Sequence, residues 1–216
     1  MISRDYIMRM VQMLAVALAK VVFNKELKQY DAAMQEIDAA AKGLLGMNGE
    51  LLLSFSEHQL FELFRSENQR DKLLAASELL REASEVFREQ GRGQEGFLQG
   101  MKAFGLFMEL LSIEPDYLKV TSADKYGGLV QYLEQYELPL PLEQKRCRYY
   151  EIIGRYDAAA QVVEEFADHD ASLRDAGAAF YERMLRKPDI ELNAGGLSKQ
   201  QAEEGLARLR RGGGAA

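Results

Sequence analysis

The chain has 216 residues and a formal net charge of −7, with 47% hydrophobic and 28% charged residues. This apolar fraction excludes a wholly disordered chain, and the acidic balance argues against a general nucleic-acid-binding protein, which usually carries a basic face. The sequence contains 30 Leu and 26 Ala against 9 Val, 7 Ile and one Thr. Because helix formers dominate, the composition excludes a large β-sheet and predicts an almost entirely α-helical protein.

Hydrophobic periodicity, capping residues and chain breakers predict a series of amphipathic helices. Two of the predicted helices begin with a reciprocal capping pair, Ser56 with Gln59 and Ser198 with Gln201. Short connections between the helices indicate antiparallel neighbours, and the segment 138–141, Leu-Pro-Leu-Pro, is the one hinge candidate. In chain order the predicted helices cover residues 3–24, 26–45, 56–64, 69–90, 94–113, 122–136, 142–153, 156–167 and 171–186, with a last helix from 198. Residues 51–55 are predicted to form a short apolar turn or helix.

The first predicted helix carries a wide apolar stripe. Its members follow alternating spacings of four and three residues, which places them on one helical face: Ile7, Val11, Leu14, Leu18 and Val21. Met8, Ala15 and Val22 widen this face. A stripe of this width needs partners on two sides, either in its own fold or in another subunit, so we expect a core helix or a homodimer interface.

Two other interpretations of the N-terminal helix are less favoured. The segment Ala17-Leu18-Ala19 resembles a signal-peptide cleavage site, but the n-region contains Asp5 and the apolar pattern continues beyond Ala19. Residues 1–30 carry a local charge of +3, which would suit attachment to a membrane surface. The polar side of the helix is nevertheless not strongly basic, and the regular spacing favours packing against protein. We therefore expect no membrane association.

Glycines inside and between the central helices suggest close packing. Gly100 and Gly105 lie within a predicted helix that they weaken, so a close approach between helices is the expected reason for them. Residues 91–96 match the pattern G-x-G-x-x-G. A dinucleotide site needs a strand before this pattern, whereas residues 80–90 are predicted to be helical, which favours an ordinary turn between helices.

One helix pair carries a small-residue and aromatic pattern. Cys147 and Tyr150 lie on its first helix, Gly154 breaks the chain, and Ala159 and Val163 follow on its second helix. This pattern resembles the tetratricopeptide repeat, in which small residues allow two helix backbones to approach. Glu143 and Arg146 stand where that motif has Trp and Leu, and the spacing to the similar segment 30–40 is not a multiple of the repeat length. The resemblance therefore implies an irregular helical-repeat fold.

The whole chain is also similar to a bacterial protein family of unknown function. The similar parts are residues 2–9, the helix that begins Tyr30-x-x-Ala33, and the segment Gly195-Gly196-Leu197-Ser198. This resemblance implies a fold like that of tetratricopeptide-repeat proteins, and it implies no activity.

Residues with catalytic or metal-binding potential are few and scattered. His58 and His169 are the only histidines, and neither lies in a Glu-x-x-His or His-Glu-x-x-His pattern, so we expect a solvated histidine rather than a metal ligand at His169. Cys147 has basic neighbours, but it occupies a position where the repeat needs a small packing residue, which predicts a buried structural thiol. We therefore expect no catalytic residues, no metal and no cofactor.

A cluster of tyrosines and basic residues is the best sequence candidate for an interaction surface. Its tyrosines are Tyr126, Tyr132, Tyr136, Tyr149, Tyr150 and Tyr156. Aromatic and arginine side chains are enriched at protein interfaces, and a basic groove suits an acidic peptide or a terminal carboxylate. The alternative is that about half of the tyrosines are core residues and the charges form a solvated rim. The candidate interaction surface comprises Lys145, Arg148, Tyr149 and Arg155.

Together these observations predict an all-α fold, an irregular array of about nine or ten antiparallel helices of the tetratricopeptide type. We expect a single domain over residues 1–211 and a flexible tail over 212–216. A lone cysteine fits a reducing cytoplasm. The most favoured function is a non-enzymatic, cytoplasmic interaction or scaffold protein that binds another protein or peptide, with a homodimer through the first helix as one possibility. The alternative is a regulatory helical protein that binds a small molecule or a metal.

Overall fold

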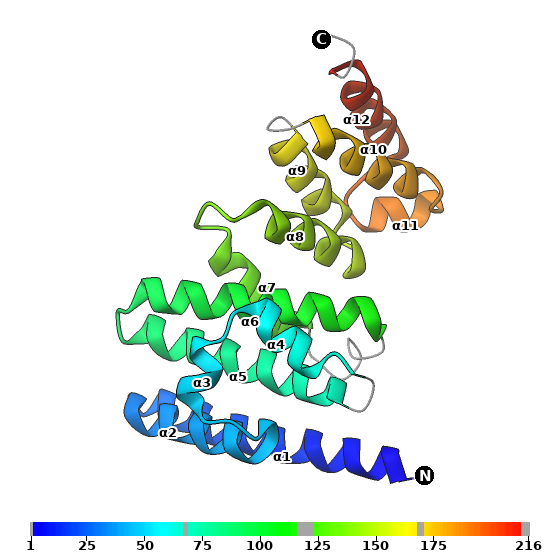
Figure 1. The fold of residues 1–216 in the computed structure, drawn as a ribbon. Helices are drawn as coiled ribbons and strands as arrows, with labels where there is room; N and C mark the ends of the chain where they lie inside the picture. The colour runs from blue at the N-terminus through cyan, green and yellow to red at the C-terminus, as the bar shows by residue number, and fades with distance from the viewer. Residues whose placement is uncertain (1, 67–68, 116–122, 168–170, 213–216) are drawn as a thin grey trace. The chain divides into compact units, whose positions relative to one another are not determined.

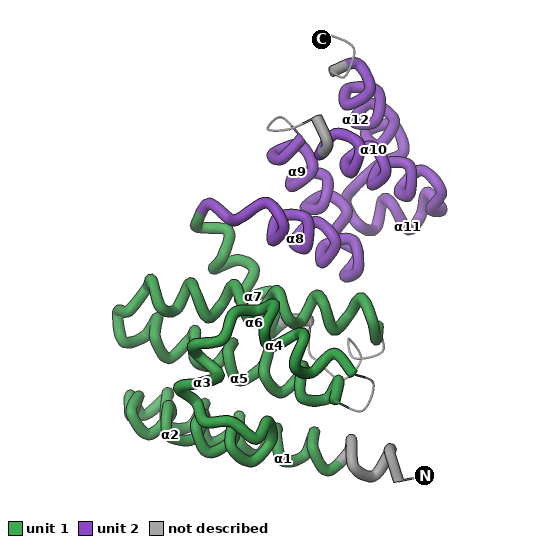
Figure 2. Tube along the Cα trace, viewed as in Figure 1, with its two compact units in different colours: residues 1–136 green, residues 137–216 purple. Residues whose placement is uncertain are grey.

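The structure, a computed structural model, describes residues 2–66, 69–115, 123–167 and 171–212, and the side chains of 2–8, 123–124, 171–172 and 212 are not described. The described residues form twelve α-helices and one π-helical turn, with no strand, so the all-α prediction is confirmed. They fall into two compact units, residues 1–136 and 137–216 (Figure 2). The division lies next to the predicted hinge at 138–141. Whether residues 1–211 fold as one domain stays a prediction.

Unit 1 contains the first seven helices and the π-helical turn (Figure 1). α5 lies at its centre, packed against α6 and α1 and also touching α2 and α4. Fifteen of its twenty residues are buried, including charged ones, which shows that unit 1 is built around this helix. The elements are α1 (Ile2–Glu26), α2 (Tyr30–Ala40), η1 (Ala41–Leu45), α3 (Gly49–Ser54), α4 (Glu57–Phe64), α5 (Arg70–Glu89), α6 (Gly93–Ile113) and α7 (Ala123–Leu133).

Unit 2 contains the remaining five helices. α8 packs against α9, and α10 packs against both α9 and α12. Cys147 on α8 donates from Sγ to the carbonyl oxygen of Ala159 on α9 at 3.7 Å, at the small-residue position that the sequence indicated. The helices are α8 (Leu140–Ile152), α9 (Tyr156–Ala167), α10 (Ala171–Leu185), α11 (Asp189–Ala194) and α12 (Lys199–Gly212).

Local sequence signals placed most helices well, but the predicted number of nine or ten is too low. The predicted helix 26–45 begins only at Tyr30, after a left-handed residue at Lys28, and its last turn is π-helical. The six-residue helix α11 was not predicted: a proline after a helical segment indicates its end, whereas Pro188 is also the N-cap of α11. Proline suits the start of a helix as well as its end, since it needs no backbone donor there.

The predicted caps and glycine contacts are present. Ser56 accepts from the backbone of Gln59 at 3.2 Å and Gln59 accepts from the backbone of Ser56 at 2.8 Å, and α12 begins with the same pair of bonds. At Gly100, a Cβ atom would lie 3.0 Å from side chains of both Leu129 and Ser84. Gly100 therefore allows α6 to approach α5 and α7 closely, as its position inside a helix predicted.

Candidate functional site

The N-terminal helix α1 carries two apolar stripes, of which only one is buried. The stripe predicted from the sequence faces α2 and α5: Leu14, Leu18 and Val21 are buried and Val11 is half-buried, while the side chain of Ile7 lies outside the described residues. A second stripe faces outward, and we call it the outer stripe. It comprises the apolar Met13, Val16 and Phe23 and the charged Lys20 on α1, with Leu27 in the turn directly after the helix.

The outer stripe is strongly exposed and regularly spaced. Met13 is 55% exposed, Val16 60%, Phe23 61% and Leu27 52%. Its members are separated by three, four, three and four residues, the spacing that keeps side chains on one seam of a helix when it packs along another helix. Exposed apolar residues gathered on one face of a helix are more typical of interaction sites than singly scattered ones are. This signal is present in the sequence but is overlooked when only the first stripe is considered.

A groove of about 510 Å³ lies beside the outer stripe, between α1 and α2. Met13 and Val16 line one wall, and small residues of α2 and η1, including Ala39 and Gly43, line the other. Its one charged pair is Lys20 with Glu36, with Nζ and Oε2 3.5 Å apart. Small residues on one wall and flexible or branched apolar residues on the other provide a shape into which a helix can pack.

Buried charges hold the C-terminal half of α1 on α5. The amino group of Lys25 bonds to the carboxylates of Glu82, at 3.2 Å, and Glu85. Arg81 pairs with Glu78 at 3.0 Å, with Glu82 at 2.6 Å and with Glu85 at 3.0 Å. Desolvation opposes the charge on Lys25, but its bonds to Glu85 and Glu82 outweigh that cost and raise the pKa of Lys25. This network therefore fixes the helix that presents the outer stripe.

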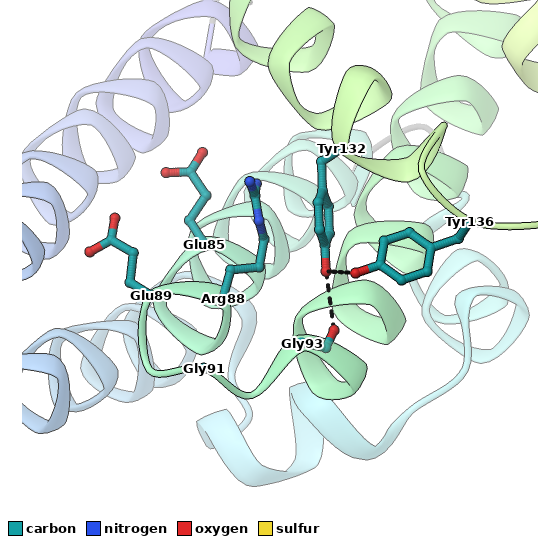
Figure 3. A pocket seen from close by; sticks show the side chains of 7 residues that line it. All are labelled: Glu85, Arg88, Glu89, Gly91, Gly93, Tyr132 and Tyr136. Carbon is teal, nitrogen blue, oxygen red and sulfur yellow. Dashed lines mark hydrogen bonds between the residues drawn. The ribbon is translucent and has the colours of Figure 1, made fainter.

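A second cavity, of about 460 Å³, lies at the turn between α5 and α6 (Figure 3). The guanidinium of Arg88 stacks on the ring of Tyr132 with 3.7 Å between the Arg88 Cζ and the ring centroid. The hydroxyl of Tyr132 donates to the carbonyl oxygen of Gly93 at 3.1 Å and accepts from the hydroxyl of Tyr136 at 3.3 Å. Burial and the Tyr136 hydroxyl raise the pKa of Tyr132 to about 12. We call this cavity, which Glu85, Glu89 and Gly91 also line, the Arg88 pocket.

The glycine motif at 91–96 forms the turn beside this pocket. It follows helix α5 rather than a strand, as predicted, and Gly91 takes the left-handed φ of 76° that ends α5. Gly96 has a packing role, since a Cβ atom there would lie 2.7 Å from Cγ of Arg88. The motif is therefore a turn between two helices.

The predicted interaction surface in unit 2 is only partly exposed. Tyr149 is fully buried, so placing it on a surface was wrong. Arg148 is exposed but pairs with Glu151 at 2.8 Å, and Arg155 is exposed but pairs with Asp157 at 3.1 Å. Lys145 is half-buried. The ring of Tyr149 is buried because it lies on a packed face of α8, and the sequence pattern alone does not show which face of this helix is packed. Binding of a partner at the remaining residues stays a prediction.

The tyrosine cluster belongs mainly to the two cores. Tyr136 is 40% exposed, whereas the other five tyrosines of the predicted cluster are buried. The sequence-based alternative placed about half of these tyrosines in the core, so the buried fraction is larger than that alternative predicted. The buried members are Tyr126, Tyr132, Tyr149, Tyr150 and Tyr156.

Cys147 is buried, as its small-residue position predicted. Desolvation is the main reason why its pKa is raised to about 12, and the nearby Glu151 acts in the same direction. His58 is exposed on α4, and His169 lies outside the described residues. Within the part of the chain that the structure describes, no three His, Cys, Asp or Glu side chains are grouped so that they could hold a metal ion. None of the described helices is both long and apolar enough to cross a membrane.

Comparison with known proteins identifies a family but no described activity. The model of a family of unknown function, DUF6483, matches residues 1–213. No curated protein and no solved structure matches the chain. Because the match covers almost the whole chain, the protein belongs to this family.

Proposed function

We propose that this member of the DUF6483 family is a non-enzymatic interaction protein that associates with a second copy of itself through α1. The observation that carries the proposal is the outer stripe, an exposed apolar seam with the spacing of a helix–helix interface. Residues 13–27 extend over roughly 20 Å of helix, enough for about four turns of contact. The adjoining groove between α1 and α2 widens the available surface.

The chemistry of the seam favours a second copy as its partner. A helix that packs along the outer stripe must itself present apolar residues at spacings of three and four, and α1 carries this pattern. An antiparallel pair with its two-fold axis near residue 18 places Met13 of one copy opposite Phe23 of the other. It also places Lys20 opposite Val16, with Glu36 beside each lysine. A parallel pair would instead bring the two copies of Lys20 together, which costs free energy.

The proposal includes a helical-repeat arrangement of the tetratricopeptide type and a cytoplasmic location. The close approach of Cys147 to Ala159 supports a repeat-like packing of α8 on α9, since the motif places small residues at this crossing. The single cysteine suits a reducing compartment. We further propose that unit 2 binds another protein or peptide through its exposed basic residues Arg148 and Arg155.

Sedimentation velocity of the full chain at about 100 μM tests self-association, because that concentration populates any dimer with a micromolar Kd. We expect a dimer, and we expect Val16→Glu and Phe23→Glu each to shift it to monomer by placing a charge in the seam. Ile190→Glu is the matched control, since Ile190 is 81% exposed on α11 and lies outside the seam. A monomeric wild-type chain, or a dimer that neither seam variant weakens, would contradict the proposal.

Disulfide trapping tests the orientation of the two copies. The natural thiol of Cys147 is buried and its raised pKa keeps it protonated, so an introduced cysteine dominates the reaction. Chains with Met13→Cys and chains with Phe23→Cys, mixed and oxidised, should form a mixed disulfide in an antiparallel dimer. If instead each variant cross-links only to its own kind, the antiparallel arrangement is wrong.

A further inference from the structure

Arg88 stacks on an aromatic ring and pairs with no acidic side chain among the described residues. Its guanidinium lies flat on the buried ring of Tyr132, and the hydrogen bonds of that ring to Gly93 and Tyr136 fix its position. α7, which carries Tyr132, is itself held on α5 by the bond between the hydroxyls of Tyr126 and Ser77. The cation is therefore preorganised, so a ligand would not have to order it.

The sequence around Arg88 explains why its donors remain available. Residues four positions away on either side are Ser84 and Arg92, which cannot form an ion pair with it. Glu85 lies three positions away, but its two oxygens already accept from Lys25 and Arg81. No carboxylate among the described residues pairs with Arg88. A guanidinium stacked on a ring keeps its N–H groups pointing outward from its edge, where they can bind a carboxylate with two parallel hydrogen bonds.

The charges of the pocket select the kind of ligand. Arg88 contributes one positive charge and Glu89 one negative charge, while the charge of Glu85 is balanced by Lys25 and Arg81. In the view of Figure 3 the two carboxylates lie on one side of Arg88 and the two tyrosine rings on the other. A phosphate or another dianion would be repelled by the carboxylate of Glu89, which lines the same pocket. A simple cation would leave the N–H donors of Arg88 without an acceptor. A zwitterion, which carries one negative and one positive group, can pair with Arg88 and with the acidic side chain at the same time.

We propose that the Arg88 pocket binds a free α-amino acid with an apolar or aromatic side chain. The carboxylate of the ligand would bind the edge of Arg88, and its ammonium group would face Glu89. Its side chain would lie along the exposed face of Tyr136, whose ring packs on Phe97 with centroids 4.4 Å apart. The cavity of about 460 Å³ has room for such a molecule. This site is independent of the proposed self-association.

Isothermal titration calorimetry with the full chain tests the need for both charges. Phenylalanine and leucine are the probes, phenylalanine methyl ester lacks the carboxylate charge, and 3-phenylpropanoate lacks the ammonium group. We expect the two amino acids to bind and each singly charged analogue to bind about tenfold more weakly or worse, as the loss of a charge-assisted bond predicts. Equal binding of either analogue, or no binding of any probe, overturns the proposal.

Substitutions locate the binding within the pocket. Arg88→Leu and Glu89→Gln should each weaken phenylalanine binding about tenfold, because each removes one charge-assisted contact. Arg92→Leu is the matched control: its guanidinium also stacks on a ring, that of Phe87 at 4.4 Å, but it does not line the pocket. Circular dichroism of every variant shows whether it is folded. Unchanged binding in folded Arg88→Leu, or an equal loss in Arg92→Leu, overturns the assignment.

Discussion

At the scale of single residues, the most unusual feature is the set of charges buried on α5. Glu78, Arg81 and Glu82 are each less than 5% exposed, although charged groups lose several kcal/mol of hydration when buried. Each carboxylate pairs with Arg81, and Lys25 of α1 adds a second cation beside Glu82. Their arrangement ties α1 to the centre of unit 1. Removing one member should therefore cost more than removing a surface charge.

Lys25→Met should destabilise the fold by about 2–3 kcal/mol, since Glu82 keeps Arg81 but loses one of its two cations. The raised pKa of Lys25 means that its stabilising effect is complete below its ordinary pKa of 10.5 and is lost as the pH rises further. Urea unfolding should thus show a large difference between wild type and variant at about pH 8 and a smaller one at about pH 11.5.

Lys42→Met is the matched control for this measurement, because Lys42 also forms an ion pair, with Asp38, but its side chain is 60% exposed and lies outside the outer stripe. It should change the free energy of unfolding by less than about 0.5 kcal/mol. If the difference between wild type and Lys25→Met were equally large at both pH values, the ion pairs would not be its source.

At the scale of helices, a glycine in α6 and a glycine in α7 differ in whether close packing requires them. Gly96 lies where α6 meets α5: its carbonyl oxygen accepts from Ser84 at 2.6 Å, and a Cβ atom would lie 3.0 Å from the Ser84 carbonyl oxygen. Gly128 is exposed in the middle of α7, and nothing lies within 4 Å of the place where its Cβ would be. Only the first glycine has a packing reason.

Gly96→Ala should therefore destabilise the protein by about 1–3 kcal/mol, because the backbone of α5 must move and this cost exceeds the gain in helix propensity. Gly128→Ala should stabilise it by about 0.5–1 kcal/mol, since it gains propensity without a clash. Thermal and urea unfolding of both variants would check the signs. Stabilisation by both substitutions would show that the contact at Gly96 is not tight.

At the scale of the whole molecule, each compact unit has its own buried core. In unit 1, Phe104 and Phe107 of α6 are buried, and in unit 2, Tyr149 of α8 and Phe180 of α10 are buried. Independent cores favour unfolding in more than one step. This expectation differs from the single domain over residues 1–211 that the sequence suggested.

Differential scanning calorimetry should accordingly resolve two transitions, one for each unit. Phe180→Ala, which should cost about 3–5 kcal/mol, should lower the midpoint of one transition, and Lys25→Met should lower the other. A single transition whose midpoint both substitutions lower would instead support one cooperative domain.

The sequence predicted those features of the fold and the site that depend on near neighbours in the chain. The capping pair of Ser56 and Gln59 involves residues three apart, and the buried stripe of α1 follows from helical periodicity alone. The exposed seam of Met13, Val16 and Phe23 was equally periodic, but periodicity does not say which of two apolar faces has a partner. Tyr149 was misplaced for the same reason.

The sequence by itself therefore determined an acidic, all-α chain and the positions of most helices, because propensity, capping and periodicity act within a few residues. Only the tertiary structure decided which charged side chains are buried in ion pairs and which can bind a ligand. Lys25 meets Glu82 across 57 residues of sequence, and Arg88 meets the ring of Tyr132 on another helix. Such contacts depend on how distant helices pack. Both the outer stripe and the Arg88 pocket follow from that packing.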